Sequence, residues 1–331
     1  MKLDFATVKS LVHGAMLVEQ RNGNVYMSRF LDAHKPNFIG TGADEYRAES
    51  LTSVHLDMIT DSRKLTVGYT NAWNTTGRPF FFFDLWIDGV LTEHVGYMAD
   101  MTRPIPRYEP DDALTFTLPE GTKRVSLYFP ELFHLELTEV SLDDGACVAP
   151  VKHEKTILVI GDSITEGHDV LYSGTDYADL VAQGLNAELY NFGLGGARFF
   201  RRIAEPAYLP DCDLVLVALG TNNFRENGLE EFLLEMPGMM DALQQRYPGK
   251  PVWVVSPIWR EDQAPRKGMC SFAQLGEHIR VETQKHPGFQ FVDGMALMPH
   301  LPAMLSDGLH PNSLGHSHYA RSLLSVLRSA D

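Results

Sequence analysis

Ser163 is the first residue in this sequence whose type and position suggest chemistry. An apolar run, Thr156–Ile160, leads into Gly161, and the serine follows two residues later. Sites in open α/β sheets form where strands end, so a hydroxyl placed here can meet a ligand. The same residues also fit an ordinary turn in which Asp162 or Ser163 caps a helix. Alone, this motif leaves both interpretations open.

Asp307 and His310, near the C-terminus, offer what a serine nucleophile lacks. A serine hydroxyl needs a base, and that base needs a partner that fixes its tautomer. The spacing of the two residues in one tight loop lets the carboxylate approach Nδ1 while Nε2 faces outward. Pro311 suits the first position of a following helix, where its missing N–H costs nothing. The alternative is an Asp-Gly turn followed by a surface histidine.

Two glycine-containing segments could supply donors for an oxyanion. Residues 191–196 follow the second predicted strand, and residues 220–223 follow the third. A tetrahedral intermediate needs donors aimed at its developing negative oxygen. The backbone N–H groups of Ser163 and Gly196, with the side chain of Asn222, would supply three. Each segment also fits a plain strand-to-helix turn, so the argument depends on their order along the chain.

Taken together, these residues resemble the SGNH, or GDSL, hydrolase family. The matching residues are Gly161–Gly167, Gly196, Asn222, Asp307 and His310, with Pro311 following as it often does in the family. The resemblance covers residues 155 to 329 and implies a flavodoxin-like sheet with esterase, lipase or acyltransferase chemistry, without a metal or other cofactor. Asn223 departs from the family pattern, which commonly has Asp there, and we expect this to alter how the loop is pinned.

We therefore predict an acyl-enzyme mechanism. Ser163 attacks the ester carbonyl, His310 takes and returns the proton, and Asp307 orients and stabilises the imidazole. Asp162 adjoins the nucleophile and is assigned to pinning the loop. Asp293, at another strand end, is a lesser rival for the role of Asp307.

Three residues are candidates for contact with substrate: Asp162, Trp259 and Arg198. Trp259 and the neighbouring Arg260 follow the fourth predicted strand, so they either line the cleft or simply pack. Arg198 lies just past the oxyanion glycine and leaves the same choice open.

The elements that must position these residues lie in the second half of the chain, 151–331. Near-continuous apolar strands separated by helices predict a parallel sheet covered on both faces. The predicted strands are Thr156–Ile160, Glu188–Asn191, Leu214–Leu219, Val252–Ser256 and Gln290–Val292. The predicted helices are Tyr172–Leu185, Leu229–Arg246, Phe272–Gln284 and Leu314–Arg328. The expected fold is a three-layer α/β domain, which the family resemblance implies to be flavodoxin-like.

The first half, 1–150, has the pattern of an antiparallel β-sandwich of jelly-roll-like type. Short segments such as Lys64–Tyr69 alternate apolar and polar residues, and Asp88-Gly89 predicts a tight hairpin turn. Phe80–Phe83 is read as core packing in preference to a carbohydrate-stacking platform. This β region followed by the GDSITEG block resembles family members with an N-terminal β-sandwich, which often act on acylated sugars.

Composition excludes several classes of partner. The 331 residues carry a formal net charge of -15, so a nucleic acid or an anionic membrane would be repelled. His310, His316 and His318 could suggest a metal, but the last two point in different directions on a helix, and we expect no metal. Three scattered cysteines and an N-terminus without a signal-peptide pattern favour a cytoplasmic location.

The predicted function is hydrolysis of short acyl esters, chiefly acetyl esters, of a carbohydrate or similar polar alcohol. The expected partner is thus a small-molecule or oligosaccharide ester, and a homo-oligomer remains open. One alternative is an acyltransferase that uses the same triad. The other is a non-catalytic carbohydrate-binding protein, against which the intact set of Ser, Gly, Asn, Asp and His argues.

Overall fold

A computed structural model describes residues 1–34, 45–102, 107–204, 209–226, 228–266 and 268–329. The chain forms two compact units. The first comprises Met1–Phe30, Tyr46–His153 and Tyr172–Gly174, and the second comprises Leu31–Glu45, Glu154–Leu171 and Thr175–Asp331. Because the units exchange short segments, the simple division into domains 1–150 and 151–331 stays a prediction.

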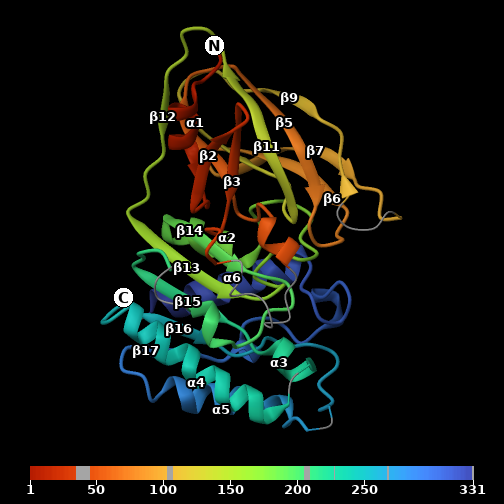
Figure 1. Ribbon diagram of the computed structural model, residues 1–331, viewed down its shortest axis with the longest axis vertical. Coiled ribbons are helices and arrows are strands. Elements are labelled where there is room, and N and C mark those ends of the chain that lie inside the picture. The colour runs from red at the N-terminus through yellow and green to blue at the C-terminus, as the bar shows by residue number, and fades with distance from the viewer. Residues whose placement is uncertain (35–44, 103–106, 205–208, 227, 267, 330–331) are drawn as a thin grey trace. The chain divides into compact units, whose positions relative to one another are not determined.

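The second unit is built on a five-stranded parallel sheet (Figure 1). Its strands, in spatial order, are β14 (Ala187–Gly193), β13 (Lys155–Gly161), β15 (Leu214–Ala218), β16 (Val252–Val255) and β17 (Phe289–Val292). In chain order this is the 2-1-3-4-5 arrangement of flavodoxin-like sheets, whose direction of winding changes beside the first strand. The carboxyl ends of β13 and β15 therefore border the crevice in which such folds place their sites.

Helices cover both faces of this sheet, as its apolar strands require. The helices are α2 (Tyr177–Leu185), α3 (Thr221–Glu226), α4 (Leu229–Arg246), α5 (Phe272–Thr283) and α6 (Ser313–Arg328). Figure 1 shows α2 and α6 over one face and α4 and α5 over the other. Successive residues of β13, Leu158, Val159 and Ile160, are all fully buried although they point to opposite faces. The predicted three-layer α/β fold is confirmed.

One predicted helix start is wrong, and so is the expected place of Pro311 at the first position of a helix. Helix α2 begins at Tyr177 and not at Tyr172, because the side chain of Asp176 caps it by accepting the N–H groups of Ala178 and Asp179. Pro311 is not in the first turn of α6 either. Asn312 is the N-cap and accepts from Leu314 and Gly315, so Pro311 precedes the helix.

The first unit is a sandwich of two antiparallel sheets. One contains β1 (Val12–His13), β4 (His55–Thr60), β10 (Lys123–Tyr128), β6 (Phe80–Ile87) and β7 (Val90–Met98), with β12 (Val148–Pro150) beside β4. The other contains β2 (Leu17–Arg21), β3 (Asn24–Ser28), β11 (Phe133–Leu142), β5 (Lys64–Asn74) and β8 (Arg107–Tyr108), with β9 (Asp112–Thr117) beside β5. A short helix, α1 (Phe5–Leu11), precedes them. The antiparallel sandwich expected from the alternating segments is thereby confirmed.

Aromatic side chains fill the core between these two sheets. Phe81 and Phe83 are about 1% exposed and point inward from β6, where Phe81 meets Phe133 of the opposite sheet at 4.9 Å between ring centroids. Phe82 points to the other side of β6 and stacks on His94 at 4.0 Å. The core interpretation of the phenylalanine run is thus confirmed for alternate residues, as the period of a strand requires.

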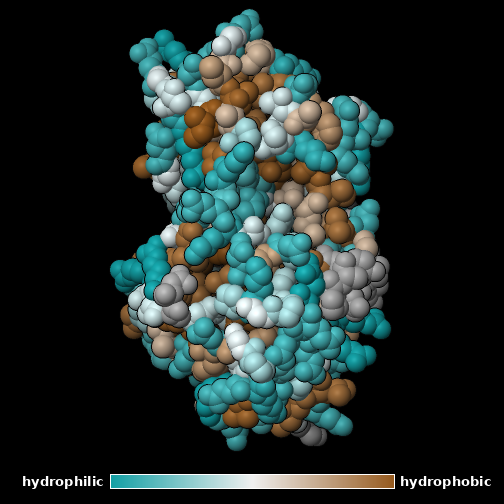
Figure 2. Space-filling view, turned by 90° about the vertical axis from the view of Figure 1, so that its left-hand side faces the viewer, coloured by the Kyte–Doolittle hydropathy of each residue, from teal (hydrophilic) through white to brown (hydrophobic). Residues whose placement is uncertain are grey.

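Charged and polar side chains predominate on the face drawn in Figure 2, with hydrophobic residues lying among them. Among the helices that the structure describes, none is both long and apolar enough to cross a membrane.

Candidate active site

The loop that carries Ser163 begins where β13 ends. A Cβ at Gly161 would collide with the side chain of Thr165, so only glycine lets the chain turn this closely. The turn is then held by backbone hydrogen bonds from Glu166 N–H to the carbonyl of Asp162 (2.9 Å) and from His168 N–H to that of Ser163 (3.0 Å). This compact loop fixes the direction of the Ser163 side chain.

Ser163, His310 and Asp307 form one hydrogen-bonded chain. Ser163 Oγ lies 2.9 Å from His310 Nε2, and His310 Nδ1 lies 2.8 Å from Asp307 Oδ2. The other carboxylate oxygen, Oδ1, accepts the backbone N–H groups of Leu309 (3.0 Å) and His310 (2.8 Å). The three residues predicted from the sequence are therefore brought together. The rival, Asp293, instead caps the turn Gly294–Ala296.

Burial and hydrogen bonding set the charge states of this chain. Burial raises the pKa of Asp307, but the hydrogen bonds from His310 and Leu309 outweigh it and bring that pKa to about 2. For His310, burial and the nearby His168 lower the pKa, and the two carboxylates Asp307 and Asp169 offset this only in part. A neutral imidazole beside an ionised carboxylate is the state required of a general base.

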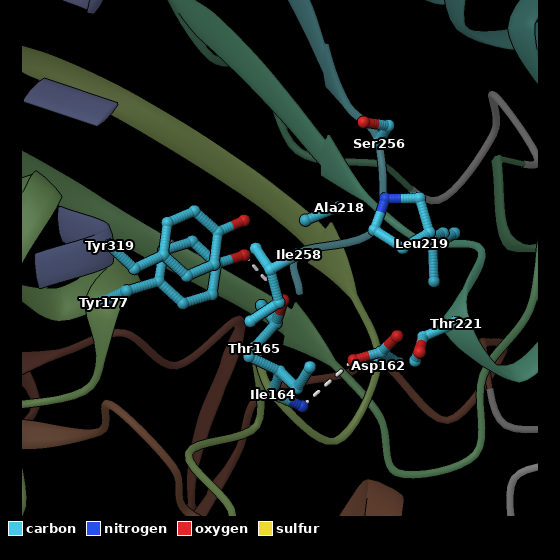
Figure 3. Close-up of a pocket in the computed structure, with 11 residues that line it drawn as sticks. Asp162, Ile164, Thr165, Tyr177, Ala218, Leu219, Thr221, Ser256, Ile258 and Tyr319 are labelled. Carbon is cyan, nitrogen blue, oxygen red and sulfur yellow. Dashed lines mark hydrogen bonds between the residues drawn. The ribbon is translucent and has the colours of Figure 1, made fainter. Parts of the chain in front are cut away.

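Asp162 faces inward beside a small cavity of about 20 Å³, which is lined also by Thr165, Tyr177 and Tyr319 (Figure 3). That space is enough for about one water molecule. The carboxylate accepts the backbone N–H of Ile164 at 3.0 Å, and burial raises the pKa of Asp162 to about 7. These contacts support the loop-pinning role, whereas contact between Asp162 and substrate stays a prediction.

The predicted oxyanion residues lie on segments that are tied to one another. Gly196 has φ +83°, a left-handed conformation that favours glycine. Asn222, on α3, donates from Nδ2 to the carbonyl of Ala197 at 3.0 Å, and Asn223 Oδ1 accepts the N–H of Phe199 at 2.9 Å. An amide nitrogen carries two hydrogens, so Asn222 keeps one for an oxyanion. Asn223 pins the loop through an oxygen, as the family's usual Asp could.

The remaining candidates from the sequence are Trp259, Arg260 and Arg198, which differ in their burial and in their contacts. Trp259 packs against the core, and its ring stacks on His300 at 5.7 Å. Arg260 is buried and donates to the carbonyl and hydroxyl of Thr221 at the start of α3. Arg198 is half-buried. For Trp259 and Arg198, a role in binding substrate stays a prediction.

Among the described residues, no cluster of possible metal ligands contains two of the three histidines that faintly suggested a metal. His316 is buried, and its Nδ1 accepts the N–H of Tyr177 at 3.1 Å. Burial lowers the pKa of His316 to about 3. His318 is exposed. We assign no metal ligands, and the prediction that the site needs no metal stays a prediction.

Sequence reasoning missed a group of charged residues around the triad. Asp169 Oδ2 lies 3.8 Å from His310 Nδ1, and the His168 and His310 rings lie 5.4 Å apart. Glu166 accepts the N–H of Gly195, next to the oxyanion glycine, at 2.6 Å. The signal was available, because all three follow Ser163 within six residues. Their relevance depends on a turn that the sequence did not reveal.

Residues 159–318 match the model of the GDSL-like lipase/acylhydrolase family. The resemblance inferred from four short blocks is thereby confirmed, and it supports the expected class of carboxylic ester hydrolases. A search of curated proteins finds no match to this chain.

Solved structures share the fold over nearly the whole chain. The salicylyl-acyltransferase SsfX3 from a tetracycline biosynthetic pathway is 22% identical, with a TM-score of 0.79 over 96% of this chain and 94% of that chain. A carbohydrate esterase family 2 enzyme with a carbohydrate-binding domain, from Corynascus thermopiles (Myceliophthora fergusii), is 18% identical, with a TM-score of 0.65 over 92% and 98%. The acetyl xylan esterase Est2A from the rumen bacterium Butyrivibrio proteoclasticus is 16% identical, with a TM-score of 0.61 over 88% and 94%. At these identities the likeness establishes the fold.

Proposed function

We propose that the protein is a serine esterase acting on short acyl esters, because residues 159–318 match the model of the GDSL-like lipase/acylhydrolase family. The observation that carries this proposal is the continuous hydrogen-bonded chain from Ser163 through His310 to Asp307. Its three members come from two segments far apart in the sequence, and each has the protonation state that acyl transfer needs.

Acylation begins with the hydroxyl of Ser163. As Oγ attacks the carbonyl carbon of the ester, its proton passes to Nε2 of His310, and Asp307 stabilises the resulting imidazolium. The negative oxygen of the tetrahedral intermediate is held by the N–H groups of Ser163 and Gly196 and by Asn222. When the intermediate collapses, the alcohol leaves with the proton from Nε2, and the acyl group remains on Oγ.

Deacylation repeats these steps with water. His310 takes a proton from the water as its oxygen attacks the acyl carbon, and the same donors hold the new oxyanion. Collapse breaks the bond to Oγ, which recovers a proton from Nε2, and the free acid departs. The enzyme returns to its starting state without any external electron donor or acceptor.

For the substrate, we propose a short acyl ester, chiefly acetyl, of a carbohydrate or a similarly polar alcohol. Two of the fold neighbours, which are named as a carbohydrate esterase and an acetyl xylan esterase, support this proposal. The sequence also offers no long apolar lid, so we expect turnover to fall steeply with acyl length. Comparison of acetyl, butyryl and octanoyl esters of one chromogenic alcohol tests this, and efficient octanoyl cleavage would contradict it.

Acyl transfer to a second alcohol is the alternative, and the fold neighbour named as a salicylyl-acyltransferase favours it. Both reactions share the acyl-enzyme and differ in what attacks it. Product analysis with and without an added sugar alcohol separates them, since a transferase yields a new ester at the expense of free acid. We further propose a cytoplasmic location, because three free cysteines suit a reducing compartment.

The decisive experiment is turnover of a chromogenic acetyl ester by the wild type and by Ser163→Ala. We expect the substitution to reduce kcat by at least ~10⁴-fold. Thermal unfolding of both proteins controls for misfolding. Equal rates in the two proteins would refute the assignment of the nucleophile, and with it the proposed mechanism.

A further inference from the structure

Asp169 faces the same ring nitrogen of His310 as Asp307 does. Asp307 Oδ2 lies 2.8 Å from Nδ1 and Asp169 Oδ2 lies 3.8 Å from it. We propose that Asp169 is a second positioning residue for His310, which stabilises the imidazolium during acyl transfer and partly replaces Asp307 when Asp307 is removed. This inference rests on the proposed function, because it concerns the base of the same reaction.

The backbone aims Asp169 at the base. Its φ is +66°, in the left-handed region that non-glycine residues seldom occupy, although Asp tolerates it better than most. Asp169 lies within a turn that is closed by a hydrogen bond from the N–H of Val170 to the carbonyl of Gly167 at 3.2 Å. The loop that presents Ser163 to one nitrogen of His310 therefore also presents a carboxylate to the other.

Solvent exposure separates the two carboxylates. The side chain of Asp307 is 45% exposed and that of Asp169 is 13% exposed. At 3.8 Å Asp169 makes no hydrogen bond to the ring nitrogen, but an ionic attraction at that range is strong where water is excluded. Asp307 thus orients the ring through a hydrogen bond, while Asp169 contributes mainly through its charge.

Several groups act on the charge of His310 together. Those around the ring are Asp307, Asp169, His168 with its neighbour Glu166, and His316 on α6. Burial and His168 lower the pKa of His310, whereas Asp307 and Asp169 raise it. Removing the charge of Asp169 should therefore lower the pKa of His310 further, a shift that a purely structural role would not produce.

The first test is an NMR titration of the His310 ring in the full-length Ser163→Ala protein, which needs no ester turnover. Asp169→Asn should lower the pKa of His310 by about half to one unit. Asp293→Asn is the matched control, because it removes one exposed carboxylate while its replacement still caps the turn Gly294–Ala296. Asp169→Gly, which also suits a positive φ, serves if the asparagine variant misfolds. Equal shifts for the positions 169 and 293 would overturn the proposal.

The second test is a double-mutant cycle in the otherwise wild-type enzyme. We expect Asp169→Asn to lower kcat about tenfold alone and about a hundredfold in the Asp307→Asn protein, with little change in KM. The same factor in both backgrounds would contradict partial replacement. If the wild type hydrolyses no ester, the proposed function fails, while the titration still decides whether Asp169 acts on His310.

Discussion

In the part of the chain that the structure describes, each unit contains a carboxylate–imidazole pair with almost the same distance between the carboxylate and the ring nitrogen. In the sandwich, Asp84 of β6 lies 2.7 Å from Nδ1 of His94 on β7, and in the α/β unit, Asp307 lies 2.8 Å from Nδ1 of His310. What differs is the surroundings of each ring. His94 stacks on Phe82 and lies against Tyr172, whereas the far nitrogen of His310 meets the hydroxyl of Ser163.

The pKa values of the two carboxylates are also shifted in opposite directions. Asp84 is fully buried, and burial raises its pKa although His94 and the N–H of Ser173 oppose that change. Asp307 is partly exposed, and hydrogen bonds from its own loop bring its pKa to about 2. A short carboxylate–imidazole distance is thus insufficient evidence for catalysis. The group facing the other nitrogen and the direction in which the pKa of the carboxylate is shifted decide what the pair can do.

The largest expected effect separates the pairs by activity. Asp307→Asn should lower kcat/KM by about 10³–10⁴-fold, because the amide favours the wrong tautomer of His310. Asp84→Asn should leave kcat nearly unchanged and lower the melting temperature instead, since its new amide hydrogens face the N–H of Ser173. Steady-state kinetics with thermal unfolding test both variants, and a similar loss of kcat in the two would erase the distinction.

The next largest effect concerns the predicted oxyanion donors near the Asp307–His310 pair. Asn222→Ala should lower kcat about 10²–10³-fold with a small change in KM, because its amide is used mainly in the transition state. Asn223→Asp is the matched control at the neighbouring position, since a carboxylate can also accept the N–H of Phe199. If kcat survives Asn222→Ala, the oxyanion is held elsewhere.

A smaller effect should appear in the pH profile. His310 acts as a base only when neutral, and its pKa is lowered by burial and by His168. The acidic limb of kcat/KM should therefore lie below the ordinary histidine pKa of about 6.5, so that activity persists in mildly acidic buffer. Measurement from pH 4 to pH 8 at constant ionic strength tests this. A limb above the ordinary value would indicate a different base or a different environment.

The smallest effect is on stability. The contributions of Asp84 and Asp307 to the free energy of unfolding should change in opposite directions with pH. The raised pKa of Asp84 means that its contribution is greatest at low pH and is lost as pH rises through the folded-state value. The lowered pKa of Asp307 means that its contribution is present above the unfolded value and is lost as pH falls toward about 2.

Thermal unfolding between pH 3 and 7 should show these opposite dependences of stability on pH. The stability advantage of the wild type over Asp84→Asn should shrink as pH rises, whereas its advantage over Asp307→Asn should grow at the acidic end and then level off. Parallel curves for the two variants would mean that the pKa values of the two carboxylates are not shifted in opposite directions.

Much of the fold of both units could be predicted from the sequence, because the signals are local. Helix α4 spans Leu229–Arg246 as the apolar spacing predicted, and the Asp88-Gly89 turn, with φ of +49° and +80°, joins β6 to β7. The Ser, His and Asp residues were also found, since the ends of parallel strands meet at one edge. Helix α2 was begun too early, because Tyr172–Gly174 belong to the other unit.

The missed features depend on backbone geometry that residue types do not specify. Asp169 was overlooked because the residue types do not reveal its left-handed backbone conformation. In that conformation its carboxylate lies near the ring of His310. The Asp84–His94 pair joins residues that face each other across two strands, a contact set by register and not by spacing. Sequence patterns thus located the reactive residues, whereas the charges around them required the structure.

The most direct test of the central claim is to trap the nucleophile. A chromogenic phosphonate ester should react with the wild type once per chain, and peptide mapping by mass spectrometry should place the adduct on Ser163. The Asp307→Asn protein should react much more slowly, and Asp84→Asn at the wild-type rate. An adduct on any other residue, or equal labelling of Ser163→Ala, would contradict the account.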